Sequence, residues 1–169
     1  MKHQPDSLSH RMRRVLLSSG ITSIAAVSAG VATVLSAALA LPVWAMFIGW
    51  VAFYTRGVSA RDGAINVICV VLGITVGMAA TLALGVVGPS LGALALPSVV
   101  FVVAVVVVSL RAAPVVNNGL CYFLGLIAFF ASHLQPSLLA VMELGSASAL
   151  GSLAGWIAHY LQRRMSHAA

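Results

Sequence analysis

Only one carboxylate of this sequence lies within an apolar segment. Asp6 and Asp62 fall in polar stretches, whereas Glu143 lies in the apolar segment that follows Pro136. A carboxylate in such a place is costly and usually faces protein or water. Two interpretations of Glu143 stay open: a proton-coupling or solute-binding group, and an interfacial carboxylate that reaches the lipid headgroups or bonds a neighbouring helix.

Amide side chains form a second group of candidates. Asn66 lies inside an apolar segment, and Asn117 and Asn118 stand at the start of another, shortly after Pro114. Amides can line a path for a neutral polar solute, but paired asparagines after a proline are also ordinary at the start of a helix. The helix-start interpretation is favoured for the pair, and solute binding is the alternative.

The remaining residues do not assemble a catalytic centre. The sequence contains no nucleophile–base pair, no phosphate-binding glycine loop and no metal-ligand cluster, and three carboxylates leave little room for a paired-acid mechanism. Cys69 and Cys121 lack metal-ligand spacing and fall in apolar segments, where thiols behave as small hydrophobes. We therefore predict a protein that is not an enzyme and binds no metal or cofactor.

Composition places these residues in a membrane protein. The chain has 169 residues, of which 61% are hydrophobic and 7% charged, against about 25% charged in soluble domains. So short a chain could not hide this much apolar surface from water, so lipid must be its main solvent. The net charge is +6, but the basic residues lie at the chain ends and in loops without interleaved aromatics, which argues against a nucleic-acid partner.

Prolines, glycines and charged residues divide the apolar sequence into six segments. The predicted transmembrane helices cover about residues 15–38, 43–55, 63–87, 91–110, 118–131 and 137–161. The valine-rich run from Val99 to Val108 predicts a helix in lipid, because the edge of an open sheet cannot be satisfied there. At ~1.5 Å per residue the second and fifth segments are shorter than the ~30 Å hydrocarbon core. They could borrow residues from their turns, thin the bilayer or be partly re-entrant.

The basic residues predict how the six segments are oriented. With the N-terminus inside, all nine lysines and arginines fall on the cytoplasmic side, in residues 1–14, 56–62, 111–117 and 163–169. The outer turns contain none, as the positive-inside rule requires. We predict one transmembrane domain over residues 15–162 in a bacterial inner membrane, between a polar, partly disordered cytoplasmic tail at 1–14 and a short cytoplasmic tail at 163–169.

Two short motifs repeat along the chain. The segments Phe47–Phe53 (FIGWVAF) and Phe123–Phe129 (FLGLIAF) are identical at four of seven positions, with an offset of 76 residues. Gly73–Gly77 and Gly151–Gly155, each with two glycines four residues apart, follow in the same order with an offset of 78.

A duplication explains both echoes. The first repeat would cover about residues 15–88 and the second about residues 89–162. Because each repeat would contain three spans, an odd number, the two repeats would have opposite orientations in the membrane. Many transporters and channels have this arrangement. The alternative is a duplicated scaffold with no role in transport.

Small residues are expected where the third and sixth segments contact other helices. Asn66, Cys69, Gly73 and Gly77 share a face of the third segment, and Ser148, Ser152, Gly155 and His159, with Gly151 beside them, share a face of the sixth. Small side chains let helix backbones approach closely. Helix packing is the favoured role of Gly73, Gly77, Ser148, Gly151, Ser152 and Gly155, and it is compatible with a solute path beside the same crossing.

The stretch from Leu41 to Tyr54, together with Phe123–Phe129 and the glycine-rich last segment, resembles a family of small bacterial inner-membrane proteins catalogued as domain of unknown function 1097. The resemblance covers about residues 18–162. It implies a multi-pass membrane protein and supplies no substrate or catalytic residues. Trp50 is a departure, because a small residue is expected there in relatives, and a path lined by this position would be narrower here.

The leading functional hypothesis is an oligomeric channel or facilitator for a small neutral polar solute such as urea or a short amide. No ring of charges is available to select ions, and short repeat-related segments are where a conduction site is expected. The predicted path residues are Glu143, Asn66, Asn117, Asn118, Phe47, Gly49, Trp50, Phe53, Phe123, Gly125 and Phe129. The alternatives are a proton-coupled transporter that uses Glu143 and an accessory membrane protein that conducts nothing.

Overall fold

The protein is almost entirely helical in the computed structural model, which describes residues 6–168, with the side chains of residues 6–10, 13, 14, 16, 17 and 168 left out. The helices are α1 (Asp6–Ala38), α2 (Val43–Tyr54), α3 (Ala60–Leu91), α4 (Ala95–Ser109), α5 (Gly119–Ser132) and α6 (Leu138–Ala168), with short 3-10 turns η1 (Gly92–Leu94) and η2 (Leu110–Ala112). No strand occurs among the described residues, and the valine-rich run forms α4 as predicted.

Within residues 6–168, three helical runs are long and apolar enough to cross a membrane, namely Ser18–Ala38, Ala60–Ala112 and Leu138–His167. The second run contains α3 and α4, which turn back on each other at Gly92, whose φ is +50°. α2 and α5 have 12 and 14 residues, so they are ~18 and ~21 Å long and shorter than a ~30 Å hydrocarbon core. The chain is therefore a helical protein of membrane type.

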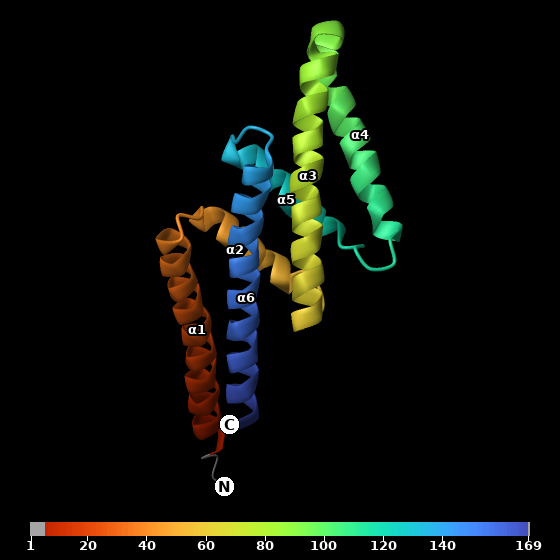
Figure 1. Ribbon diagram of the computed structural model, residues 1–169. Helices are drawn as coiled ribbons and strands as arrows, with labels where there is room; N and C mark the ends of the chain where they lie inside the picture. Colours follow the sequence, from red (N-terminus) through yellow and green to blue (C-terminus); the bar gives the residue numbers. More distant parts are fainter. Residues whose placement is uncertain (1–5, 169) are drawn as a thin grey trace.

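The long helices form two antiparallel pairs, and the short helices cross between them. Figure 1 shows α1 beside α6 and α3 beside α4, with α2 and α5 running obliquely behind the long helices. The beginning of α1 and the end of α6 lie at the same end of the molecule. α2 packs mainly on α6, and α5 packs mainly on α3.

The helices at both chain ends extend beyond the predicted transmembrane segments. α1 begins at Asp6, so residues 6–14 of the predicted tail are helical, and residues 1–5 lie outside the described part; α6 continues past the Arg163–Arg164 pair to Ala168. The two helices support each other there, since Gln162 Nε2 donates to the Ile21 carbonyl at 2.9 Å and the Met165 side chain packs on Gly20. Tertiary packing of this kind supplies most helical stability in proteins.

The predicted end of the third helix at residues 88–90 is wrong. α3 continues through Pro89 to Leu91, and the chain turns at Gly92. Proline removes one hydrogen bond of the helix, a loss that membrane helices tolerate. The positive φ that turns the chain is easiest for glycine, so α4 starts at Ala95 rather than near Leu91.

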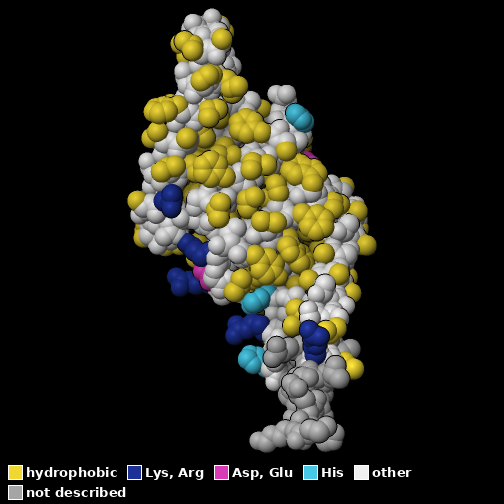
Figure 2. Space-filling view, turned by 180° about the vertical axis from the view of Figure 1, so that it is seen from behind, with side chains coloured by type: hydrophobic (Ala, Val, Ile, Leu, Met, Phe, Trp, Pro, Cys, Tyr) yellow, Lys and Arg dark blue, Asp and Glu magenta, His cyan; other side chains and the backbone are white. Residues whose placement is uncertain are grey.

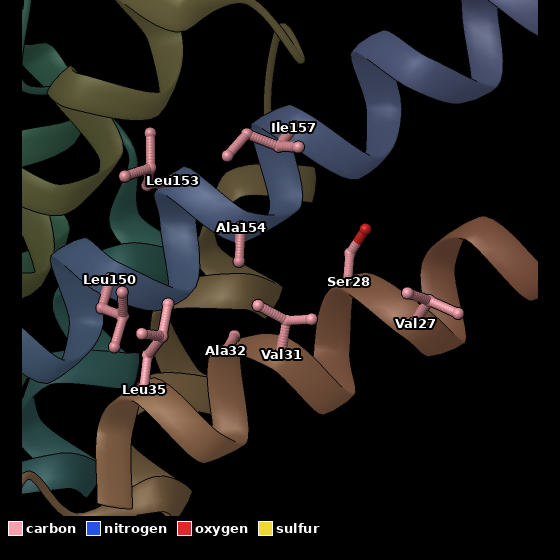
Figure 3. A pocket seen from close by; sticks show the side chains of 9 residues that line it. All are labelled: Val27, Ser28, Val31, Ala32, Leu35, Leu150, Leu153, Ala154 and Ile157. Carbon is pink, nitrogen blue, oxygen red and sulfur yellow. The ribbon is translucent and has the colours of Figure 1, made fainter. Parts of the chain in front are cut away.

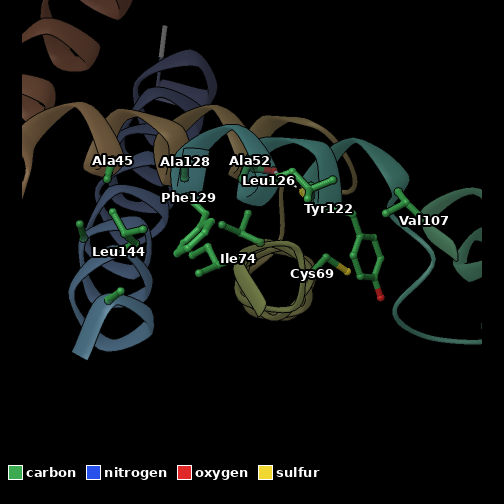
Figure 4. Packing of buried hydrophobic residues seen from close by; sticks show 14 residues of the cluster. Ala45, Ala52, Cys69, Ile74, Val107, Tyr122, Leu126, Ala128, Phe129 and Leu144 are labelled. Carbon is green, nitrogen blue, oxygen red and sulfur yellow. Dashed lines mark hydrogen bonds between the residues drawn. The ribbon is translucent and has the colours of Figure 1, made fainter. Parts of the chain in front are cut away.

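The core lies where α2, α3, α5 and α6 meet. Figure 4 shows Ile74 of α3, Tyr122 and Phe129 of α5 and Leu144 of α6 around this centre, and all four are buried. The outer surface is largely apolar as well. Figure 2 shows hydrophobic side chains over most of one face, with arginines only in its middle and lower parts.

Candidate functional site

α2 crosses α6 in close backbone contact. A Cβ atom on Gly49 would meet the Ser148 carbonyl, and one on Gly151 would meet the Met46 carbonyl. The Ser148 hydroxyl also donates to the Ala45 carbonyl at 3.3 Å. The contact therefore requires glycine on both helices.

Phe53 closes the same crossing at the end of α2. Its ring lies within 3.2–3.4 Å of the place where Gly155 would carry a Cβ, and it also covers Gly63 of α3. Ser152 is buried beside it and donates to the Gly63 carbonyl at 3.5 Å. The small residues of α6 thus leave space against which the Phe53 ring packs.

α5 crosses α3 in the same way. A Cβ atom on Gly125 would meet the Val70 carbonyl, and one on Gly73 would meet the Tyr122 carbonyl. The Phe129 ring covers Gly77, with its atoms 3.1–3.3 Å from the place of a Cβ.

Residues that the two repeated motifs place at corresponding positions make the contacts of both crossings. The offset of 76 residues relates Gly49 to Gly125 and Met46 to Tyr122, and the offset of 78 relates Gly73 to Gly151 and Val70 to Ser148. The short helix in each half of the chain therefore packs on a long helix of the other half. The motifs that echo along the chain are the ones that make these contacts.

The aromatic and glycine residues predicted to line a solute path lie in or beside these crossings. Gly49 and Gly125 are sealed between backbones, and Phe53 and Phe129 are buried. Phe47 and Phe123 are 42% and 43% exposed on the outside. Trp50 is half-buried and packs in a small cluster with Ala32 and Met46. A solute path through one copy has no room at the two crossings.

A buried polar cluster lies where the end of α2, the first half of α3 and the start of α5 meet. Asn66 is fully buried, and its Nδ2 donates to the Ala52 and Arg56 carbonyls at 2.9 and 3.3 Å. Asn118 Nδ2 donates to Asn66 Oδ1 at 2.8 Å and to Thr55 Oγ1 at 2.7 Å. Thr55 also contacts the Cys121 sulfur at 3.3 Å.

The hydrogen-bond capacity of these amides is unevenly used. Both hydrogens of Asn66 and its oxygen are occupied, so this residue serves the fold. Asn118 uses both hydrogens, and its Oδ1 has no partner among the described residues. Asn117 Oδ1 accepts from Arg56 Nη1, while its Nδ2 has no described partner. One acceptor and one amide donor group are therefore free.

These free groups belong to residues that line a pocket of about 390 Å³ at the start of α5. The pocket is lined by Val107, Val108, Arg111, Asn117, Asn118, Gly119, Leu120 and Phe123. It combines a guanidinium group, an amide donor and an amide acceptor with an apolar floor. Such a surface can bind a small molecule that both donates and accepts hydrogen bonds.

The positions related to the polar cluster by the motif offsets of 76 and 78 residues are apolar. The positions that correspond to Asn118, Cys121, Thr55 and Asn66 are occupied by Pro42, Ala45, Ala131 and Leu144. The polar cluster is therefore built at one end of the molecule only.

Glu143 is not part of the cluster. It lies half-buried in the second turn of α6, and its carboxylate has no hydrogen-bond partner among the described residues. The equivalent position on α3 is Ile65. The structure brings Asn66, Asn117 and Asn118 together and leaves Glu143 apart from them.

The other grooves among the described residues are lined mainly by apolar side chains. Figure 3 shows one between α1 and α6, with a volume of about 220 Å³, where Val31 and Leu35 face Leu150 and Ala154. Ser28 supplies its one polar side chain. Such a surface suits lipid chains rather than a polar solute.

The sequence does not predict the part that Thr55, Cys121 and Arg111 take in the polar cluster and its pocket. Thr55 and Cys121 are 66 residues apart and meet only through the fold. Arg111 was interpreted as a charge that orients the chain, although it also lines the pocket. No spacing in the sequence signals that these residues come together.

Comparison with known proteins assigns the family. No curated protein and no solved structure matches the chain. The sequence model of a family described as "protein of unknown function (DUF1097)" matches residues 23–162, which include the second half of α1 and all of α2 to α5. The match confirms the family resemblance of the repeated motifs, and the protein belongs to the DUF1097 family.

Proposed function

We propose that the protein crosses the bacterial inner membrane six times as two inverted repeats, residues 15–88 and 89–162, with both termini in the cytoplasm. The equivalent contacts of the two crossings support the repeat, because each short helix packs on the long helix of the opposite half. The shared end of α1 and α6 and the absence of arginine from the upper part of the face in Figure 2 support the orientation.

In this membrane the protein facilitates passage of a small neutral polar solute, with urea or a short amide as the class that fits. The observation that carries this proposal is the pocket at the start of α5. Its free Asn117 amide donors and its free Asn118 oxygen complement the carbonyl and the N–H groups of an amide. The protein works without catalysis or a cofactor, because binding and release are all that a facilitator requires.

The proposed path runs between copies of a homo-oligomer. Within one copy, the glycine contacts close both crossings, and apolar residues replace the polar cluster in the other repeat. A second copy beside the pocket would supply the missing wall. A monomeric facilitator is less compatible with this closed interior.

Proton coupling through Glu143 is the second candidate. A half-buried carboxylate without a described partner is the observation that favours it. Because Glu143 lies apart from the amide pocket, the two candidates predict different sensitive residues. An accessory protein without transport is the third outcome of the test.

Stopped-flow measurements on proteoliposomes test these alternatives with urea, acetamide and weak acids. We expect urea or acetamide flux that falls at least about fivefold in Asn117→Leu and in Leu120→Trp, since one removes the free donors and the other fills the pocket. Leu138→Trp is the matched control, because Leu138 is 75% exposed at the start of α6. Flux lost in Glu143→Gln with a proton gradient indicates coupling, and no flux above protein-free liposomes contradicts the proposal.

A further inference from the structure

The α5 pocket adjoins an apolar groove that is lined by α3, α4 and α5. A second cavity of about 170 Å³ is lined by residues that include Val99, Val103, Leu126 and Phe130. Phe123 lines both cavities. The polar pocket and the apolar groove therefore follow one seam, since both lie along α4 and α5.

The polar end of this seam is positively charged. Arg111 is exposed, and its aliphatic stem packs on Gly119, with Cγ 3.3 Å from the place of a Cβ. Arg56 lies close by, because its guanidinium donates to Asn117 Oδ1 and to the Val115 carbonyl. No carboxylate of a described residue forms an ion pair with either arginine, since the Asp62 side chain bonds with Ser59 and Glu143 is on α6. The charge of Arg111 is thus available to a ligand.

The apolar end of the seam faces the membrane. Leu96, Val100 and Phe130 line the groove and are 58%, 56% and 46% exposed. From Leu120 to Phe130, α5 extends ~15 Å along its own axis. A charged end next to an apolar trough of this length has the shape of an amphiphile.

We infer that the α4–α5 seam binds an anionic phospholipid of the inner leaflet, with its phosphate at Arg111 and one acyl chain along Phe123 and Phe130. A guanidinium group binds a phosphate through paired N–H donors, and the orientation proposed above places Arg111 at the cytoplasmic surface. The phosphate group is the shared chemistry of a lipid and of free phosphate, and the acyl groove favours the lipid. Lipid binding is measured without transport, so it can hold even where the proposed facilitator function fails.

Native mass spectrometry of the full-length protein in a mild detergent tests this inference. The probes are phosphatidylglycerol and phosphatidylcholine with the same acyl chains. We expect Arg111→Gln to weaken phosphatidylglycerol binding about fivefold, the factor that corresponds to ~1 kcal/mol for one basic residue at an anionic surface. Arg61→Gln is the matched control, because Arg61 is exposed outside the seam, and its binding should equal that of the unmodified protein.

Two further binding measurements use the unmodified protein. Dimyristoyl phosphatidylglycerol should bind at least about tenfold more tightly than the dihexanoyl form, because only the longer chain fills the groove. Millimolar inorganic phosphate should not displace the lipid. Three results would each overturn the lipid site. They are an equal loss of phosphatidylglycerol binding in Arg111→Gln and Arg61→Gln, equal affinity for the two chain lengths, and displacement of the lipid by free phosphate.

Discussion

At the scale of single residues, the three asparagines near the start of α5 divide into one that holds the fold and two that line a pocket. Asn66 donates both amide hydrogens, to the Ala52 and Arg56 carbonyls, and its oxygen accepts from Asn118. Asn117 and Asn118 keep unpaired groups beside a cavity. These unpaired groups are the ones that the proposed solute would contact.

The different use of these amides predicts different costs of substitution. Asn66→Leu should lower the free energy of unfolding by about 1–3 kcal/mol, because it leaves Asn118 with an unpaired donor. Asn117→Ala should change it by less than about 0.5 kcal/mol, since Asn117 is exposed. Equilibrium unfolding in mixed micelles, followed by circular dichroism, measures both. Equal costs for the two variants would contradict the division.

At the scale of elements, two pairs of helices depend on glycine at their crossings. The packing of α2 on α6 and of α5 on α3 leaves no space for a side chain at Gly49, Gly73, Gly125 or Gly151. Membrane helices associate largely through such close packing. The glycines at these positions therefore stabilise the protein through tertiary packing and not through helix propensity.

Alanine substitutions separate the crossings from the outer surface. Gly151→Ala and its repeat equivalent Gly73→Ala should each lower the free energy of unfolding by about 1–3 kcal/mol, because a methyl group would displace the facing backbone. Gly30→Ala is the control, since a Cβ there meets nothing within 4 Å, and it should be neutral or stabilising by up to about 1 kcal/mol. Thermal unfolding in detergent checks the order. A tolerated Gly151→Ala would rule out the close crossing.

At the scale of the whole molecule, the proposed orientation puts every basic residue on one side of the membrane. With Cys69 and Cys121 replaced by alanine, a cysteine at Ser59 or Ala112 should react with an impermeant maleimide only from the cytoplasmic side. A cysteine at Ser90 or Gln135 should react only from the periplasm. Labelling of position 59 from the periplasm would overturn the six-span topology.

The closed interior predicts that the protein does not work as a monomer. Light scattering coupled to size-exclusion chromatography in detergent should give a protein mass of at least twice the 17.4 kDa of one chain. The mass should remain stable on dilution, because a path between copies requires a lasting contact. If the measured mass is that of one chain at all concentrations, the proposed path between copies is wrong.

The sequence by itself determined the features that depend on local chemistry. Apolar length predicted helices near all six observed positions, and proline at 42 and 114 marked two of the connections. The repeated glycine and phenylalanine motifs pointed to positions that make equivalent contacts. These features are readable because helix formation in lipid follows from hydropathy and breakers along the chain.

Only the tertiary structure decided what the motifs touch and where the polar groups meet. Sequence spacing could not show that Gly49 faces Ser148 or that Thr55 reaches Cys121, since these pairs lie 99 and 66 residues apart. It also missed the helical ends at residues 6–14 and 163–168, which α1 and α6 stabilise through contacts such as that of Gln162 with Ile21. Contacts between distant segments depend on how helices pack, and the pattern along one helix does not contain that information.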